Sequence, residues 1–317
     1  MPTGRSGCRP RRSVLLTNMK LLKFTTIMND DKRTVRLLYP QWQGGVVAHW
    51  MPDIPPEDAA RGYYLGAHLL AMLAPPTADR IVEVPVALDG DDRAAENGIS
   101  GYRAILRQTE AALALMREYD PDRIVTLGGE CSVSVVPFTY LASKYGGDVA
   151  VVWIDAHPDV TLPFDGYEGY HAMALTACLG LGDPQLMRLL PAKFDASKAL
   201  IVGVRSWDDG MKRRQEELGV AGLAPAEVRA DRSAVSDWLK RSGASKAVVH
   251  FDLDVLDPAE IVAGVGVEPD GLRIDEAVRI IRDIAAEHEL VGLTVAEPMP
   301  RVALKLRNML AELPLMK

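Results

Sequence analysis

Two short motifs, each following an apolar run, carry the side chains best suited to catalysis. DAHPD (155–159) follows VAVVWI, and DLD (252–254) follows AVVHF. The acidic and histidine side chains alternate within each motif, so they share one face wherever the backbone stays extended. Gathered carboxylates repel one another, and burying them without a counterion is unfavourable. The pattern therefore predicts a site for one or two divalent cations.

Two further apolar runs end in polar residues. GGECS (128–132) follows IVTL, and Glu297 follows LVGLTVA. A single histidine among several carboxylates favours a hard ion such as Mn²⁺. Two ions that share carboxylates can activate a water and polarise a substrate. Either motif alone is more typical of a cap or turn at a strand end, whereas their combination favours the catalytic interpretation.

The elements that must position these residues alternate along the chain. Apolar runs predict strands over 33–40, 79–88, 122–129, 148–156, 198–205, 246–256 and 290–297. Amphipathic stretches predict helices over 55–74, 99–119, 133–146, 211–219, 231–243, 273–289 and 301–313. This alternation is typical of an α/β fold with a parallel sheet and helices on both faces. Ligands bind such sheets at the carboxyl ends of the strands, where the acidic motifs lie.

Composition and charge exclude several classes of partner. The 317 residues carry a formal net charge of −7 and three cysteines. A mildly acidic chain without a basic patch argues against a nucleic-acid partner. No apolar run approaches the ~20 residues of a membrane span, so no membrane partner is expected. Few cysteines are typical of a reducing compartment, which predicts a cytoplasmic protein.

The N-terminal segment differs from the rest of the chain. Residues 1–33 are rich in arginine and lysine, and polar residues interrupt their short apolar patch. A secretory signal needs ~7–15 uninterrupted apolar residues, so none is predicted. We expect a disordered extension over 1–33, or a translation start near Met19 or Met28, and then a single domain over 34–317.

The order of the motifs resembles the ureohydrolase family, which includes arginase, agmatinase, guanidinobutyrase and formimidoylglutamase. That family has a GGDHS turn, DAHxD, a later histidine, SFDxDxxDP, and a glutamate near an Asn-Pro pair. Here these stand as GGECS, DAHPD, His171, HFDLDVLDP (250–258) and AEPMP (296–300). The resemblance implies a three-layer α/β/α fold with a central, mostly parallel sheet of about eight strands. It also implies hydrolysis of a linear amidine or guanidino compound with release of urea, and a homo-oligomer.

The resemblance further implies two manganese ions per subunit. Asp155 and Asp252 would bridge the ions, and Asp159 would complete the first site and bond to the attacking hydroxide. His157 and Asp254 would complete the second site.

The resemblance also assigns residues to the substrate. His171 corresponds to the histidine that shuttles protons, and Glu297 to the carboxylate that holds the guanidinium. Asp208, in GVRSWDDG, corresponds to an aspartate near the substrate pocket. These roles agree with the chemistry, because a carboxylate binds guanidinium well and histidine titrates near neutrality.

Cys131 departs from the family, which has a metal-binding histidine at this position of the GGDHS turn. The cysteine would bind the first ion as a thiolate, remain a thiol beside a weak site, or mark a protein that no longer hydrolyses anything. The first reading adds negative charge and favours softer ions. A cysteine here also resembles Nω-hydroxyarginine amidinohydrolases of the same family, although His171 departs from that subgroup.

The substrate is left open by the loop at 160–170. It lacks the Ser-x-Asn pair with which arginases bind the amino-acid part of arginine, so free L-arginine is not expected. Asp165 and Glu168 favour a substrate with a cationic tail, such as agmatine, or form an ordinary solvated loop. Nω-hydroxyarginine, formimidoylglutamate and a non-catalytic protein with an impaired metal site are the alternatives. His250 is interpreted as a packing residue rather than a ligand.

Overall fold

A single parallel sheet organises the part of the chain that the structure describes, residues 32–88 and 93–314 of the computed structural model. Its eight strands lie in the order β2-β1-β3-β8-β7-β4-β5-β6. Their bounds are β1 Thr34–Tyr39, β2 Arg80–Glu83, β3 Arg123–Gly128, β4 Val149–Ile154, β5 Ala199–Val202, β6 Ala221–Leu223, β7 Lys246–Asp252 and β8 Glu289–Ala296. All neighbouring pairs are parallel, which confirms the predicted fold class. Residues 1–31 of the predicted extension lie outside the described residues.

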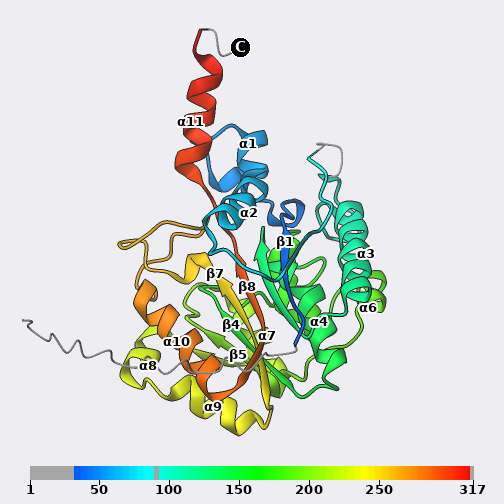
Figure 1. Cartoon of the computed structure of the whole chain (residues 1–317). Helices are drawn as coiled ribbons and strands as arrows, with labels where there is room; N and C mark the ends of the chain where they lie inside the picture. Colours follow the sequence, from blue (N-terminus) through cyan, green and yellow to red (C-terminus); the bar gives the residue numbers. More distant parts are fainter. Residues whose placement is uncertain (1–31, 89–92, 315–317) are drawn as a thin grey trace, which may run out of the picture. The chain divides into compact units, whose positions relative to one another are not determined.

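Helices cover both faces of the sheet (Figure 1). The helices are α1 Pro56–Ala60, α2 Gly62–Leu73, α3 Tyr102–Tyr119, α4 Val135–Lys144, α5 Ala174–Cys178, α6 Pro184–Leu189, α7 Asp209–Leu218, α8 Pro225–Ala230, α9 Ala234–Ser242, α10 Ile274–Glu287 and α11 Arg301–Glu312. Side chains of α3 and α4 share one buried cluster with β4, and those of α9 and α10 share another. In the described part of the chain, no helix has the length and apolar character of a membrane span.

The burial of strand β4 explains why its sequence is apolar throughout. All six of its residues are buried. Val151 and Trp153 belong to the cluster with α3 and α4, whereas Val152 and Ile154 belong to the cluster with α9 and α10. A strand buried on both faces has no polar position to alternate with, as expected for the centre of a parallel sheet.

Several elements differ from the sequence prediction, among them the helices α5, α6 and α8, which were not expected. The helix expected over 55–74 is two helices, separated at Arg61. A β-carbon at Gly66 would lie 1.7 Å from the carbonyl oxygen of Pro298, so this glycine lets α2 approach the segment after β8. Strand β6 was missed because its three residues, AGL, carry no alternating or β-branched signal.

The ends of β4 and β7 matter most for function. The strand expected over 246–256 ends at Asp252, and Leu253–Val255 form a 3₁₀ turn. Asp252 Oδ1 accepts the backbone N–H of Asp254 at 2.7 Å. Similarly, Asp155 Oδ1 accepts the backbone N–H of His157 at 2.6 Å, just after β4. The acidic side chains therefore converge through turns that they cap themselves, and not through continued alternation along an extended strand.

Candidate metal centre

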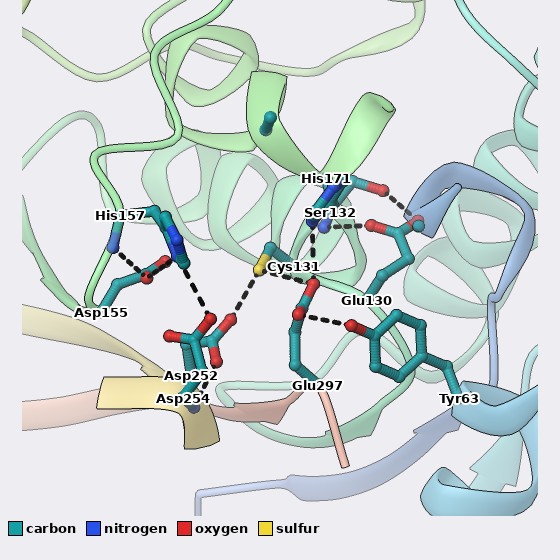
Figure 2. A network of polar contacts seen from close by, with 12 residues as sticks. Tyr63, Glu130, Cys131, Ser132, Asp155, His157, His171, Asp252, Asp254 and Glu297 are labelled. Atoms are coloured by element: carbon teal, nitrogen blue, oxygen red, sulfur yellow. Dashed lines mark hydrogen bonds and ion pairs between the residues drawn. The ribbon is translucent and has the colours of Figure 1, made fainter. Parts of the chain in front are cut away.

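A cavity of about 430 Å³ lies at the carboxyl ends of the central strands. Five of the predicted metal ligands line it, namely Cys131, His157, Asp159, Asp252 and Asp254. Asp155 is fully buried beside them. Figure 2 shows the carboxylates of Asp155, Asp252 and Asp254 facing His157 and Cys131. The structure thus brings together side chains from three separate strand ends.

The largest group of possible ligands holds four residues. Cys131, Asp155, His250 and Asp252 each present one ligand atom, and these atoms all lie within 4.8 Å of one another. Cys131 Sγ is 2.8 Å from Asp252 Oδ2, and His250 Nε2 is 4.0 Å from Asp155 Oδ2. Sequence analysis expected Asp159 in this group and did not expect His250.

A second group holds Asp155, His157 and Asp254. His157 Nδ1 is 3.1 Å from Asp254 Oδ2 and 3.5 Å from Asp155 Oδ1. Burial alone would lower the pKa of His157, but the adjacent carboxylates outweigh it and hold this pKa well above its usual value. This arrangement brings together the imidazole and carboxylates that the sequence assigned to the second ion.

Glu297 lines the same cavity and belongs to two further groups of possible ligands, one with Cys131 and His171 and one with Asp252 and Asp254. Its side chain accepts a hydrogen bond from Tyr63 Oη at 2.5 Å and lies 2.9 Å from His171 Nδ1. Burial and the Glu297 charge raise the pKa of Tyr63 well above its usual value, so the phenol stays protonated and donates. Tyr167 Oη is 2.7 Å from the other nitrogen of His171. Two of the three predicted substrate residues, His171 and Glu297, are therefore held in fixed orientations.

The carboxylates are strained electrostatically by their burial. Burial, with the charge of Asp254, raises the pKa of Asp155 to about 6. Burial and neighbouring carboxylates also raise the pKa values of Asp159 and Asp252 well above the usual range. Asp159 Oδ2 and Asp254 Oδ1 are buried without a hydrogen-bond partner among the described residues. Buried acids with unused oxygens fit a site for divalent cations.

Cys131 is a buried thiol in this arrangement. Burial and the surrounding carboxylates raise its pKa well above the usual value. The thiol donates to Asp252 Oδ2 and lies 3.3 Å from Glu297 Oε1. A coordinated cation would favour the thiolate over this protonated thiol, because metal binding deprotonates a thiol ligand.

Glu130 holds the turn that presents Cys131. Its buried carboxylate accepts the backbone N–H and the hydroxyl of Ser132, both at 2.7 Å, and the amide of Gln41 at 2.5 Å. A β-carbon at Gly129 would lie 1.8 Å from the carbonyl oxygen of Gln41, so only glycine allows this close approach. The GGE part of GGECS therefore positions the cysteine.

Three acidic candidates lie away from the cavity. Asp208 is exposed, and its Oδ1 accepts the backbone N–H of Met211 as the N-cap of α7. Asp165 pairs with Arg214, and Glu168 accepts the hydroxyl of Ser100 at 3.2 Å. The substrate role of Asp208 stays a prediction that this geometry does not support. The cationic-tail role of Asp165 and Glu168 likewise has no support from their positions.

Sequence reasoning missed several residues at the site. Tyr63 lies within a predicted helix, and nothing in its local sequence marks it for function. Glu268 lines the cavity from a loop and was likewise not singled out, whereas Trp50, interpreted as core or pocket wall, lines it from the 3₁₀ helix Ala48–Trp50. His250 did carry a sequence signal, because it precedes Asp252 by two residues on the same strand and so shares its face. It was nevertheless interpreted as a packing residue.

Comparison with known proteins agrees with this geometry. The arginase family model matches residues 77–311, more than half of the chain. An arginase of Entamoeba histolytica is 26% identical over 214 residues, which cover 65% of this chain and 70% of that protein. A mitochondrial arginase 1 of Arabidopsis thaliana is 27% identical over 190 residues, which cover 60% of this chain but only about half, 52%, of the plant protein.

A solved structure supports the same assignment at the level of the fold. The Entamoeba histolytica arginase in complex with L-ornithine superposes with a TM-score of 0.68 at 18% identity, covering 86% of this chain and 92% of that chain. The family match and the shared parallel sheet together show that the chain belongs to the arginase family, hydrolases that act on carbon–nitrogen bonds in linear amidines.

Proposed function

We propose that this protein hydrolyses a guanidino compound with the help of two divalent cations and releases urea and an amine. The observation that carries the proposal is the buried set of carboxylates, imidazoles and a thiol that shares one cavity with Glu297. Bound cations would activate a water and polarise the substrate. Asp155 and Asp252 each belong to two of the ligand groups, as does Asp254, and Asp155 and Asp252 are the proposed bridging residues.

Glu297 is the proposed binding site for the guanidinium. A carboxylate binds this planar cation through paired hydrogen bonds, which fix its orientation as well as its position. Tyr63 and His171 hold the Glu297 carboxylate from two directions. Their contacts pre-organise the carboxylate, so less freedom is lost when the substrate binds.

His171 is the proposed proton donor to the leaving amine. It lines the cavity, and its two ring nitrogens contact Glu297 and Tyr167. The neighbouring charge of Glu297 favours the protonated imidazole, which is the form that donates. Asp159, which lines the cavity, is the proposed acceptor of a hydrogen bond from the attacking water.

The proposed substrate has a cationic or uncharged tail, with agmatine as the leading example. Among the described residues that line the cavity, none is a lysine or arginine that would bind a carboxylate tail. The outer wall instead offers Trp50, Met211 and Val267, with Glu268 as an acidic group among them. This acid replaces Asp165 and Glu168 as the residue with which a cationic tail would pair.

Urea release from a substrate panel tests the proposal. Agmatine, guanidinobutyrate, arginine, Nω-hydroxyarginine and formimidoylglutamate are assayed with purified protein after reconstitution with Mn²⁺. We expect the greatest kcat/KM with agmatine, and a drop for that substrate alone in Glu268→Gln. No turnover of any substrate, together with no bound metal, would identify a non-catalytic member of the family.

We also infer a homo-oligomer, as the family resemblance implied. Helix α11 has one buried residue, Leu304, and exposes apolar side chains along its length. The exposed fractions of Val302, Leu306 and Met309 are 73%, 50% and 52%. An apolar helix face of this kind is typical of an association surface. Light scattering of the wild type and of Leu306→Glu measures the subunit number and its dependence on this face.

A further inference from the structure

His250 is a buried imidazole with one nitrogen unused. Its side chain is fully buried, and its ring stacks on Trp153 with centroids 3.7 Å apart and planes 12° apart. Nδ1 is hydrogen-bonded to Ser134 Oγ at 2.8 Å. Nε2 has no hydrogen-bond partner among the described residues. Packing alone does not explain a buried nitrogen left without a partner, since such a group is unfavourable in a protein core.

The sheet places this nitrogen beneath the cation site. His250 and Asp252 are two residues apart on β7, and Trp153 and Asp155 are two residues apart at the end of β4. Trp153 and His250 are also direct partners in the parallel register. All four side chains therefore share one face, with the two rings forming the row below the two carboxylates. Cys131 reaches the same position from the end of β3.

The contact with Ser134 is compatible with the tautomer that a ligand needs. A histidine that binds metal through one nitrogen usually donates its other N–H to a fixed acceptor. Ser134 Oγ, a hydroxyl that can donate or accept, can accept from Nδ1–H, which would leave the lone pair of Nε2 free. One ring nitrogen of His250 and the ligand atoms of Cys131, Asp155 and Asp252 lie within 4.8 Å of one another, close enough for one ion, and Nε2 is 4.0 Å from Asp155 Oδ2.

We propose that His250 is a metal ligand, and that Cys131, Asp155, His250 and Asp252 together form the first cation site. This inference rests on the proposed metal dependence and changes the expected ligand set. The ureohydrolase pattern has histidine at position 131 and serine at position 250, and this chain differs at both. The imidazole missing from the turn after β3 is supplied instead from β7.

The relocated histidine changes the site in two ways. Thiolate and imidazole favour softer ions, so this site would prefer Zn²⁺ or Co²⁺ to Mn²⁺, whereas the second, oxygen-rich group still suits Mn²⁺. Asp159 is also freed from coordination. It belongs to none of the ligand groups found among the described residues, and its Oδ2 is buried without a hydrogen-bond partner among them.

Metal stoichiometry of the purified full chain tests the ligand role. His250→Asn keeps an amide nitrogen near the position of Nδ1, and with it the contact to Ser134, but removes Nε2. We expect this variant to bind one of its two ions at least about 100-fold more weakly, because even residues behind a ligand change affinity by 10–100-fold. Ser134→Ala should weaken the same ion by about 10-fold. Wild-type affinity in His250→Asn would overturn the proposal.

Thr294→Val is the matched control. Thr294 is buried, lies beside His250 in the register between β7 and β8, and has a side-chain oxygen without a partner in the described structure. This variant disturbs the same layer of the core but removes no ligand, so both ions should bind as in the wild type. Thermal unfolding of the metal-free proteins separates a folding defect from a binding defect.

Rescue and direct observation complete the test. Adding Cys131→His to His250→Asn should restore the ion of the first site, because an imidazole is then supplied from the turn after β3. A wild-type crystal soaked in Zn²⁺ should show anomalous density beside His250 Nε2 and Cys131 Sγ. Density at Asp159 without contact to His250 would refute the proposal even if His250→Asn does not fold. A wild type that binds no ion would instead refute the proposed metal-dependent function.

Discussion

Aspartates lie at both ends of the parallel strands, but in opposite surroundings. At the amino ends they are paired with cations or hydroxyls near the surface. Lys144 Nζ lies 2.9 Å from both Asp120 and Asp122, which precede β3. Asp148, which precedes β4, accepts the backbone N–H of Ser245 at 2.8 Å. At the carboxyl ends, the aspartates are buried against one another and against a thiol.

The pKa values of the two sets move in opposite directions, except at Asp254. Burial disfavours the charged form of Asp254, but the adjacent His157 outweighs burial and lowers this pKa to about 2. Hydrogen bonds from Lys144 hold the pKa of Asp120 below its usual value, and those from Ser245 do the same for Asp148. Burial raises the pKa values of Asp155, Asp159 and Asp252. The same side chain therefore supports the folded state at one edge of the sheet and opposes it at the other. Buried carboxylates that destabilise the folded state and are nevertheless present indicate a site that a ligand completes.

The largest expected effect comes from Asp252→Asn at the carboxyl edge. Loss of this ligand should lower kcat/KM by at least about 10³-fold, as when electrostatic stabilisation of a transition state is removed. The metal-free variant should nevertheless unfold at a higher temperature than the metal-free wild type, because one buried charge is gone. Steady-state kinetics and thermal unfolding with chelator measure the two effects. A less stable variant would contradict the view that this edge is electrostatically strained.

The pH dependence of stability in the metal-free wild type and Asp252→Asn sharpens this prediction. The pKa of Asp252 is higher in the folded than in the unfolded state, so the folded state binds more protons and wild-type stability falls as pH rises. The stability gap between Asp252→Asn and the wild type should therefore be small below about pH 3.9, the unfolded pKa, and grow above it. Metal-free denaturant titrations across this range measure the gap.

Added cations should stabilise the protein only by binding the acidic side chains at the carboxyl ends of the strands. A ligand at 100 times its Kd stabilises the folded state by about 2.7 kcal/mol per site. We expect a shift of this size with Zn²⁺ or Mn²⁺ in the wild type, and a much smaller one in Asp252→Asn. Thermal unfolding with and without metal at constant ionic strength measures it. An equal shift in both proteins would place the cation elsewhere.

A smaller effect is expected for Tyr63→Phe. This change removes one hydrogen bond to Glu297, worth about 0.5–1.5 kcal/mol, so kcat/KM should fall by roughly 3–10-fold. Metal content should not change, since Tyr63 belongs to none of the ligand groups in the described residues. Loss of metal in this variant would show that the two sides of the cavity are not independent.

The smallest effect is expected at the amino edge. Lys144→Met removes ion pairs of a partly exposed lysine and should change stability by no more than about 1 kcal/mol. The pKa of Asp122 is lowered in the folded state, so this contribution is present above the unfolded pKa and disappears as pH falls. Denaturant titrations at two pH values measure it, with kcat and metal content unchanged. A loss of activity here would break the division between the two edges.

Much of this arrangement could be predicted from the sequence because parallel sheets follow simple rules. Apolar runs predicted the start of each expected strand to within one residue, although the strands predicted to end at 88, 205 and 256 end three to five residues earlier. Residues after the apolar runs had to meet at one edge of the sheet. Asp155, Asp252 and Glu297 were placed at that edge on this reasoning, and all three are buried there. The short strand β6 and the break at Arg61 were not predictable, since neither has a local signal.

The sequence by itself determined which strand ends carry acids and that Cys131 replaces a histidine of the ureohydrolase pattern. Only the tertiary structure decided which side chains form a candidate ion site. It brought His250 together with Cys131, left Asp159 outside the ligand groups, and delivered Tyr63 from a distant helix. Spacing fixes the face and edge that a side chain reaches, but its partners depend on the turns after each strand and on segments that fold against them.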